Sequence, residues 1–245
     1  MPFLGFAAFI IGESDAKADL HSLNRETKER VDASILWLIA ERIPCIMLQM
    51  IKAVDSMAIT IEAVFGNLPV LETERTILRK LQFQDAEDMF LYGSDPEVSR
   101  YTTWPPHQSL EGTRRFIETV LNAYEEQKIA SWAIEDKHSR KMIGTAGFVN
   151  WNTAHSRAEL GYALSREFWK RGYMTEIVKR IVDFGFNEMK LVRIEARCHP
   201  DNIGSARVME KSGMQFEGIL RKHMYVKGEY QDVKMYSIIH EALDG

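Results

Sequence analysis

The segment Phe168-Trp169-Lys170-Arg171-Gly172-Tyr173-Met174-Thr175-Glu176 carries the strongest local signal in the chain. It follows a predicted strand that ends near Leu164 and precedes a predicted helix. Unpartnered backbone N–H groups and the positive end of the helix dipole meet at such a helix N-terminus, which favours an anion. Lys170 and Arg171 add positive charge, and Gly172 lets the backbone approach a phosphate. The segment alone is equally typical of a basic surface turn before an amphipathic helix.

Hydrophobic patterns on both sides of this segment predict a mixed α/β domain. Helices are expected over Gln84–Tyr92, from Ser109 onward, over Thr175–Asn187 and over Ile203–Ser212. Strands are expected over Thr76–Leu81, Ala130–Glu135, Lys141–Asn150, Arg157–Leu164 and Leu191–Cys198, and on both sides of Lys227-Gly228-Glu229. The predicted order is β-α-α-β-β-β-α-β-α-β-β.

Turn residues at Gly66-Asn67-Leu68-Pro69 divide the chain into two parts. Residues 1–66 are predicted to be a helical N-terminal extension of unknown role, and residues 70–245 the catalytic domain. The apolar start of the chain lacks a basic region and is followed by Glu13 and Asp15, which disfavours a secretory signal. No window reaches the ~18 uninterrupted apolar residues of a membrane span.

The composition is that of an ordinary globular protein. Hydrophobic residues make up 45% of the 245 residues, charged residues make up 27%, and the net charge is −4. This balance gives no support for a nucleic-acid surface, which would need a clustered basic face. The two cysteines, Cys45 and Cys198, form neither a disulfide framework nor a zinc pattern, which favours a reducing compartment and a cytoplasmic location. No histidine has a partner at metal-ligand spacing.

Five pieces of sequence, in order, resemble one known family. They are Leu71–Arg79, Ala158–Leu164, Trp169–Glu176, Asn202–Met214 and Gly228–Asp232. Together they resemble the GNAT superfamily of N-acetyltransferases, in particular the branch with the ribosomal-protein alanine and serine acetyltransferases. The resemblance covers roughly the last seven-tenths of the chain, and several weak motifs in register make a strong signal together.

The resemblance implies a fold and a cofactor. The fold would be α/β, with a mixed, mostly antiparallel sheet, a splayed central parallel strand pair and helices on both faces. Acetyl-CoA would be the co-substrate, with no metal, in the cleft between Arg157–Leu164 and Leu191–Cys198. Its pantetheine arm would pair with the backbone of Gly161, Tyr162, Ala163 and Leu164. Its pyrophosphate would lie at Trp169, Lys170, Arg171, Gly172, Tyr173, Met174 and Thr175.

The sequence departs from the family pattern at five positions. Trp169 stands at a Gln/Arg position, Lys170 where this branch usually has glycine, and Met174 at the final Gly/Ala. Lys170 still offers an amide, so phosphate binding survives unless that site needs a positive φ. Met209 stands where many relatives have a tyrosine that protonates the departing thiolate. Met224 stands where the ribosomal stalk-protein enzyme has its proposed glutamate base.

Direct attack by an amine needs a group that takes the amine proton. Glu159 is the first candidate for this catalytic role, since it lies on the strand beside the cofactor. The alternative is a surface carboxylate paired with Arg157 or Arg193. Glu195 is the second candidate base and is also typical of a structural ion-pair member.

The helix that follows Cys198 supplies two further candidates. Ser205 matches the hydroxyl that faces the CoA sulfur in this branch, and its alternative role is to satisfy a backbone amide in the first helical turn. Asn202 is expected to cap this helix, to contact the cofactor, or to do both. Because no covalent intermediate is required, Cys198 is expected to be a small buried hydrophobe.

The resulting hypothesis is an enzyme that transfers an acetyl group from acetyl-CoA to a primary amine, either a protein N-terminus or a small molecule. No nucleic acid or membrane is expected as a partner, and a homodimer is left open. The alternative is a catalytically silent acyl-CoA-binding regulatory domain, which the methionines at positions 209 and 224 keep open. A third hypothesis makes the N-terminal helices a partner-binding module.

Overall fold

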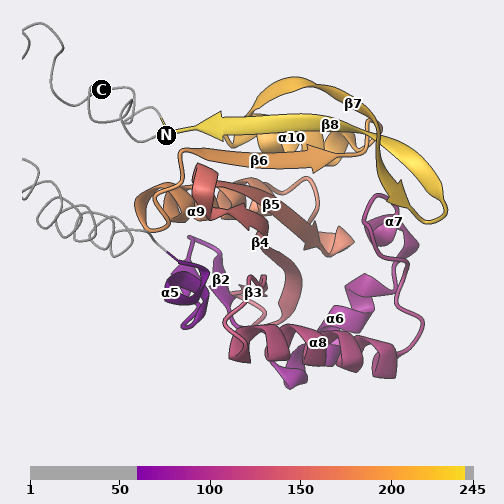
Figure 1. The fold of residues 1–245 in the computed structure, drawn as a ribbon. Helices are drawn as coiled ribbons and strands as arrows, with labels where there is room; N and C mark the ends of the chain where they lie inside the picture. Colours follow the sequence, from indigo (N-terminus) through magenta and orange to yellow (C-terminus); the bar gives the residue numbers. More distant parts are fainter. Residues whose placement is uncertain (1–59, 241–245) are drawn as a thin grey trace, which may run out of the picture. The chain divides into compact units, whose positions relative to one another are not determined.

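The computed structural model describes residues 60–240, which form one eight-stranded sheet with helices packed on it (Figure 1). The strands are β1 (Leu71–Glu72), β2 (Thr76–Arg79), β3 (Trp132–Asp136), β4 (Met142–Asn152), β5 (Arg157–Leu164), β6 (Arg193–Cys198), β7 (Gln215–Val226) and β8 (Glu229–Ile239). Their spatial order is β1-β2-β3-β4-β5-β6-β8-β7. All neighbours are antiparallel except β5 and β6, which confirms the predicted mixed sheet with one central parallel pair.

The described helices are α5 (Ile61–Phe65), α6 (Ala86–Gly93), α7 (Pro96–Ser99), α8 (Leu110–Glu125), α9 (Tyr173–Asn187) and α10 (Ile203–Lys211). Short 3₁₀ turns lie at Phe83–Asp85, Thr153–His155 and Arg166–Phe168. Figure 1 shows α6 and α8 together at one side of the sheet, and α9 and α10 together at another. No helix within residues 60–240 has the length and apolar character needed to cross a membrane.

The hydrophobic core extends back to α5. Phe65 is fully buried, and its ring lies 6.3 Å from the rings of Trp132 and Trp151. Both tryptophans are buried, so they are core residues here, and Trp132 donates its indole N–H to the Pro69 carbonyl at 2.7 Å. The rest of the expected extension, residues 1–59, lies outside the described residues. Since Phe65 belongs to the core, α5 packs with the domain that follows it.

A buried ion cluster joins the start of the sheet to the turn before α6. Arg79 on β2 donates two hydrogen bonds to Asp85, both of 2.8 Å, and one of 2.7 Å to Glu135 on β3. The hydrogen bonds to Asp85, and then to Glu135, raise the pKa of Arg79 above its usual range although burial opposes this. Arg79 therefore compensates both carboxylates, whereas Arg140 reaches Glu135 alone.

Replacing the Arg79 guanidinium should be costly. We expect Arg79→Ala to lower the free energy of unfolding by about 3–5 kcal/mol, because buried Asp85 loses its cation and Glu135 keeps only the exposed Arg140. Arg140→Ala is the matched control, since Arg140 is 69% exposed and reaches Glu135 from the surface at 3.0 Å. It should cost less than about 1 kcal/mol. Urea unfolding measures both, and equal losses would contradict the assignment of Arg79 as the central cation.

Candidate active site

The parallel pair β5–β6 separates before either strand ends. Residues pair from Arg157 with Arg193 up to Leu160 with Ala196, and no later pair forms. Beyond that point β5 stays paired with β4 as far as Leu164, and β6 stays paired with β8. The segment Gly161–Leu164 therefore has one edge that no strand of the described sheet covers. A free strand edge of this kind accepts an extended ligand as an added strand.

The predicted basic turn leads from β5 into α9. Trp169, Lys170, Arg171 and Gly172 are exposed, whereas Tyr173 and Met174 begin α9 and are buried. The helix starts two residues earlier than expected, so Thr175 lies within its first turn. Gly172 is the N-cap residue, and no side chain accepts a hydrogen bond from the first-turn amides. These amides are thus free to meet an anion.

Two residues of this turn have left-handed backbone. Gly172 has φ 83°, and Lys170 has φ 59°. A Cβ on Gly172 would meet nothing closer than the Arg75 guanidinium at 3.5 Å, so the glycine is needed for its conformation more than for space. Lys170 thus has a positive φ, which glycine would adopt more easily. The replacement of the family's usual glycine by Lys170 therefore affects the backbone of the turn. The Lys170 backbone is strained, while its amide stays in the turn.

Arg75, in the turn between β1 and β2, holds the basic turn in place. Its backbone N–H and its Nε donate to the two carboxylate oxygens of Glu176, at 3.0 and 2.7 Å. Its Nη1 donates to the Arg171 carbonyl at 2.9 Å, and its guanidinium lies 4.1 Å from the centre of the Tyr173 ring. Burial alone would raise the pKa of Glu176, but hydrogen bonds from Thr73 and Arg75 lower it below its usual value.

Trp169 links the turn back to β5. Its indole N–H donates to the Leu164 carbonyl at 2.8 Å, although the residue is 37% exposed. The tryptophan at the family's Gln/Arg position thus occupies the last carbonyl of the free β5 edge. Ser165 donates its backbone N–H to the Ile143 carbonyl of β4, and by strand alternation Ala163 and Gly161 face β4 as well. The backbone groups left for an added strand are therefore those of Tyr162 and the N–H of Leu164.

Glu159 lies on β5 next to the point of separation. Its partner is Arg197 on β6, whose Nε lies 2.8 Å from Glu159 Oε1, and not Arg157 or Arg193 as the alternative supposed. Burial raises the pKa of Glu159 above its usual value, while Arg197 acts in the opposite direction. Only 14% of the Glu159 side chain is exposed. The carboxylate is therefore partly desolvated but charge-paired.

Glu195 takes part in ion pairs of the kind expected for a structural carboxylate. Its Oε1 lies 2.6 Å from Arg193 Nε and 3.3 Å from Arg157 Nη1. Arg157 and Arg193 are the arginines that the sequence suggested as possible ion-pair partners of Glu159. Glu195 is thus held by two cations, whereas Glu159 has one.

The first turn of α10 brings Asn202 and Ser205 to the same region. Asn202 is the N-cap, and its side-chain oxygen accepts the Ser205 backbone N–H at 3.1 Å. The Ser205 hydroxyl is therefore not used for capping. It lies 2.8 Å from the Tyr162 hydroxyl on β5. Cys198 is buried, and burial raises the pKa of its thiol to about 11, so the thiolate needed for a nucleophile is disfavoured.

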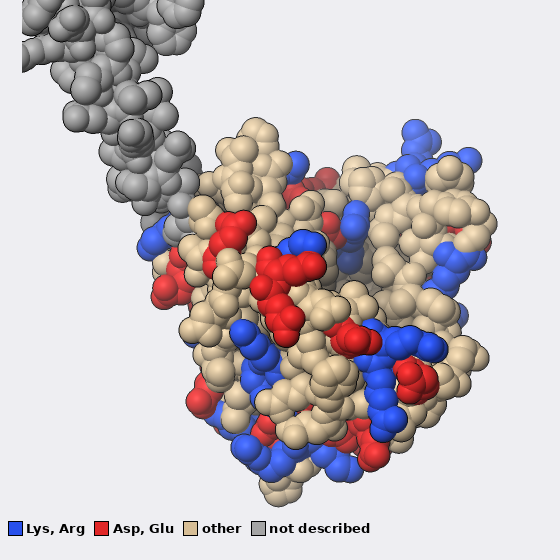
Figure 2. Space-filling view, turned by 60° about the horizontal axis from the view of Figure 1, so that its bottom comes forward, with Lys and Arg blue, Asp and Glu red and all other residues tan. Residues whose placement is uncertain are grey.

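The segment after α7 lies against the end of β6 and the tip of the β7–β8 hairpin. Figure 1 shows α7 next to the tip of the β7–β8 hairpin, and Lys227 at that tip donates to the Ser99 carbonyl at 2.6 Å. Tyr101 stacks on His199, with ring centres 5.1 Å apart. The space-filling view shows a hollow in the face that it presents, with lysine or arginine side chains on the wall (Figure 2).

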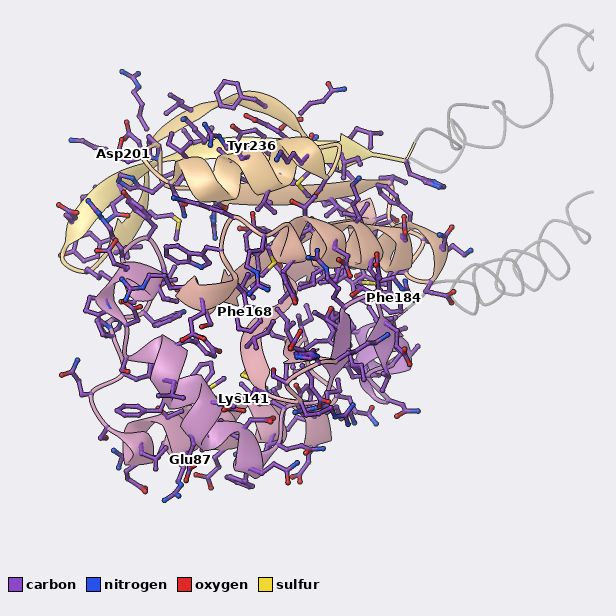
Figure 3. All side chains as sticks on the ribbon, turned by 180° about the vertical axis from the view of Figure 1, so that it is seen from behind. Glu87, Lys141, Phe168, Phe184, Asp201 and Tyr236 are labelled. Atoms are coloured by element: carbon purple, nitrogen blue, oxygen red, sulfur yellow. The ribbon has the colours of Figure 1, made fainter. Side chains whose placement is uncertain are left out.

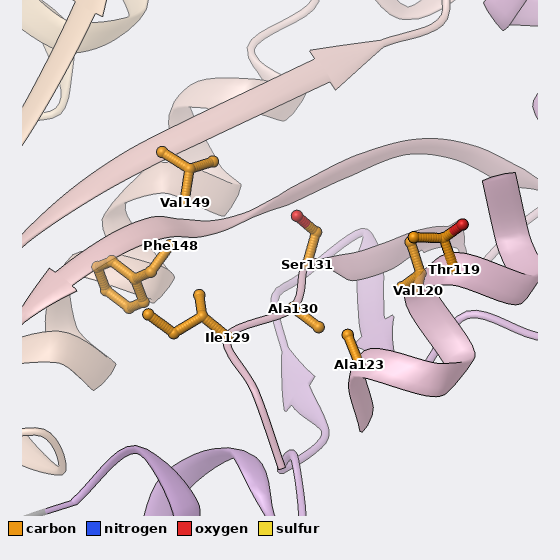
Figure 4. Close-up of a pocket in the computed structure, with 8 residues that line it drawn as sticks. All are labelled: Thr119, Val120, Ala123, Ile129, Ala130, Ser131, Phe148 and Val149. Carbon is orange, nitrogen blue, oxygen red and sulfur yellow. The ribbon is translucent and has the colours of Figure 1, made fainter. Parts of the chain in front are cut away.

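A second hollow of about 290 Å³ lies between α8 and the strands β3 and β4 (Figure 4). It is lined by Thr119, Val120, Ala123, Ile129, Ala130, Ser131, Phe148 and Val149. None of these side chains is charged, so this hollow offers no acid or base. Within residues 60–240, no group of three His, Cys, Asp or Glu side chains is arranged to hold a metal.

The separated parallel pair, the free β5 edge and the uncapped helix N-terminus define a GNAT-type N-acetyltransferase fold. A family model described as "Acetyltransferase (GNAT) domain" matches residues 75–215. An uncharacterized N-acetyltransferase, YoaA, of Bacillus subtilis is 39% identical over 171 residues, which are 70% of this chain and 97% of that protein. The chain belongs to the GNAT family of N-acetyltransferases, and it is an enzyme of that class.

Solved structures agree with this assignment. The crystal structure of a GNAT-family acetyltransferase from Bacillus anthracis is 30% identical, with a TM-score of 0.63, and the match covers 70% of this chain and 98% of that one. RimL, a ribosomal L7/L12 α-N-protein acetyltransferase solved in complex with CoA, is 21% identical with a TM-score of 0.63. That match covers 71% of this chain and 99% of the RimL chain, and it shows a shared fold.

Three groups around the site were not predicted from the sequence. Arg75 and Arg197 reach their partners across long sequence separations, and Tyr162 was assigned a role for its backbone alone. Arg193, Glu195 and Arg197 stand at alternate positions and so share one face of the predicted strand. This alternation is the sequence signal that places Arg197 among the charged residues of the site. The pairing of Arg197 with Glu159 depends on the register of the parallel strands, which periodicity does not reveal.

The strained lysine gives a direct stability test. We expect Lys170→Gly to raise the free energy of unfolding by about 1 kcal/mol, because relief of the left-handed strain exceeds the added entropy of the unfolded chain. Lys170→Ala removes the same charge but keeps the strain, so its stability should stay within ~0.5 kcal/mol of the parent. Urea unfolding of the pair measures the difference. If the two variants are equally stable, the strain at this position is negligible.

Proposed function

We propose that this chain transfers the acetyl group of acetyl-CoA directly to a primary amine, either a protein N-terminus or a small-molecule amine. The observation that carries the proposal is the free β5 edge leading into the uncapped N-terminus of α9. The pantetheine arm would pair with the outward-facing backbone groups of the segment Gly161–Leu164, which are those of Tyr162 and the N–H of Leu164. The pyrophosphate would accept from the amides of Tyr173 to Thr175. Lys170 and Arg171 would add charge to this site, and residues 70–245 together with α5 would form the catalytic domain.

Glu159 is the proposed general base. An alkylamine with a pKa of about 10 is almost wholly protonated at neutral pH, whereas an α-amino group at about 8 needs less help. A partly buried carboxylate with a raised pKa accepts such a proton more readily than an exposed one. The amine nitrogen would then attack the thioester carbonyl carbon, and the C–S bond would break as the tetrahedral intermediate collapses.

The Glu159–Arg197 ion pair favours the alternative, a silent acyl-CoA-binding domain, in addition to the methionines at positions 209 and 224. A carboxylate already paired with an arginine is a weaker base than a free one, since the cation favours its charged form. A free-CoA release assay over a panel of small amines and ribosomal-protein N-terminal peptides separates the two functions. An acetyltransferase releases CoA and forms an acetylated product with at least one amine, whereas a silent domain binds acetyl-CoA and releases none.

Replacing the proposed base should produce a pH-dependent defect. We expect Glu159→Gln to lower kcat by at least about a hundredfold at pH 7, because a general base typically contributes ~10²–10⁴-fold. The deficit should shrink as pH rises and free amine forms without help. Burial raises the pKa of Glu159. The pH at which kcat of the parent enzyme falls on the acid side should therefore lie above the usual pKa range of a glutamate.

Glu195→Gln is the matched control, because Glu195 sits opposite Glu159 in the strand register. It should keep kcat within severalfold of the parent, since its two arginines give it a structural role. If Glu195→Gln loses activity while Glu159→Gln retains it, the base has been assigned to the wrong carboxylate. Near-ultraviolet circular dichroism checks that both variants are folded.

A further inference from the structure

The Tyr162 side chain bridges the gap where β5 and β6 part. Tyr162 follows the last paired residues of β5 by two positions, and it is partly buried. Its hydroxyl lies 2.8 Å from the Ser205 hydroxyl and 3.3 Å from the Ser205 carbonyl, both in the first turn of α10. The tyrosine thus connects the strand that would carry the pantetheine arm with the helix that carries the candidate catalytic hydroxyl.

The hydrogen-bond inventory limits how these two hydroxyls can be arranged. Each hydroxyl has one proton to donate and two lone pairs that accept. In one arrangement Ser205 donates to Tyr162, and Tyr162 donates to the more distant carbonyl. In the other, Tyr162 donates to Ser205 Oγ through the 2.8 Å contact, and the Ser205 proton is left free for another acceptor. Because Asn202 already caps the helix, no capping duty competes for the Ser205 side chain.

We propose that Tyr162 is a positioning residue which donates to Ser205 Oγ and so turns the Ser205 proton toward the sulfur of the departing CoA. The proposal rests on the proposed acetyl transfer. As the C–S bond breaks, its electron pair moves to sulfur, and the Ser205 O–H donates a hydrogen bond to the forming thiolate. The proton that leaves the amine reaches solvent through Glu159, and the thiolate takes one proton back from solvent. Protons and electrons therefore balance without a further reactant.

The surroundings of Tyr162 favour an orienting role over proton donation. Burial raises the pKa of Tyr162 above its usual range, although the hydrogen bond with Ser205 acts in the opposite direction. A tyrosine that gave up its proton here would leave a poorly solvated phenolate. Holding the hydroxyl neutral keeps it as a donor throughout the reaction, so the tyrosine acts through Ser205.

A double-mutant cycle tests this dependence. We expect Tyr162→Phe and Ser205→Ala each to lower kcat about tenfold, as expected for a lost hydrogen bond to developing charge, with KM for acetyl-CoA changed less than about twofold. The double variant should be no slower than Ser205→Ala alone, because Tyr162 acts only through that hydroxyl. Losses that multiply in the double variant, or a Tyr162→Phe enzyme with normal kcat, would overturn the proposal.

Tyr236→Phe is the matched control. Tyr236 on β8 is also buried, and its hydroxyl donates to Glu210 near the other end of α10 at 3.2 Å (Figure 3). Removing this hydroxyl takes one buried hydrogen bond from the same helix without touching Ser205. It should leave kcat within about twofold of the parent, so a tenfold loss in this control would assign the effect of Tyr162→Phe to helix packing.

A binding experiment separates this proposal from the proposed function. If Ser205 donates to sulfur, bound CoA should ionise at lower pH than free CoA, whose thiol resembles cysteine with a pKa of about 8.5. CoA affinity measured by calorimetry should then rise about tenfold between pH 7 and pH 9, relative to S-methyl-CoA, which has no ionisable thiol. Tyr162→Phe should lose most of this rise.

The outcomes are distinct. A protein that shows the affinity rise but acetylates no amine would refute the proposed function and support the role of Tyr162. A protein that acetylates amines but shows the same affinity rise in Tyr162→Phe would keep the function and overturn the positioning role. Failure to bind CoA at all would refute both.

Discussion

The site depends on the interruption of pairing between β5 and β6. Backbone groups need partners, and β5 satisfies only one of its edges after Leu160, through β4. Each of the two parallel strands leads into a helix, β5 into α9 and β6 into α10, so both helix N-termini follow the carboxyl ends of the diverging strands. Ligands in open α/β sheets bind at such ends. One gap therefore brings together a free strand edge, a helix N-terminus without a cap and the Ser205 hydroxyl.

The turn that receives the proposed pyrophosphate is strained and held by distant contacts. Lys170 and Gly172 both adopt left-handed backbone, which costs about 1–2 kcal/mol for the lysine. Arg75 offsets part of this through Glu176 and the Arg171 carbonyl, although it comes from the other end of the domain in sequence. The shape of the turn is thus fixed before any ligand arrives, which lowers the entropic cost of binding.

Hydrophobic periodicity predicted the order of the main strands and helices, because elements such as β6 and α9 bury one face. The splayed parallel pair was implied by the resemblance to the GNAT superfamily. Periodicity placed β5 at Arg157–Leu164 as observed and α9 within two residues of its start. It missed the two-residue strand β1 and the short helix α7, although Pro96 at the first position of α7 is typical of a helix start. The partners of Glu159 and the Tyr162 side chain were beyond reach, since they depend on strand register and on how α10 packs against β5.

Amide hydrogen exchange tests the placement of the cofactor most directly. Pantetheine alone should slow exchange of the outward-facing amides of the free β5 edge, those of Tyr162 and Leu164, and leave α9 unchanged. CoA, which adds the pyrophosphate and nucleotide, should also slow exchange in the first turn of α9, Tyr173 to Thr175. Protection confined to α8 and the start of β3 would contradict the account, because it would place the ligand in the uncharged hollow instead of the gap between β5 and β6.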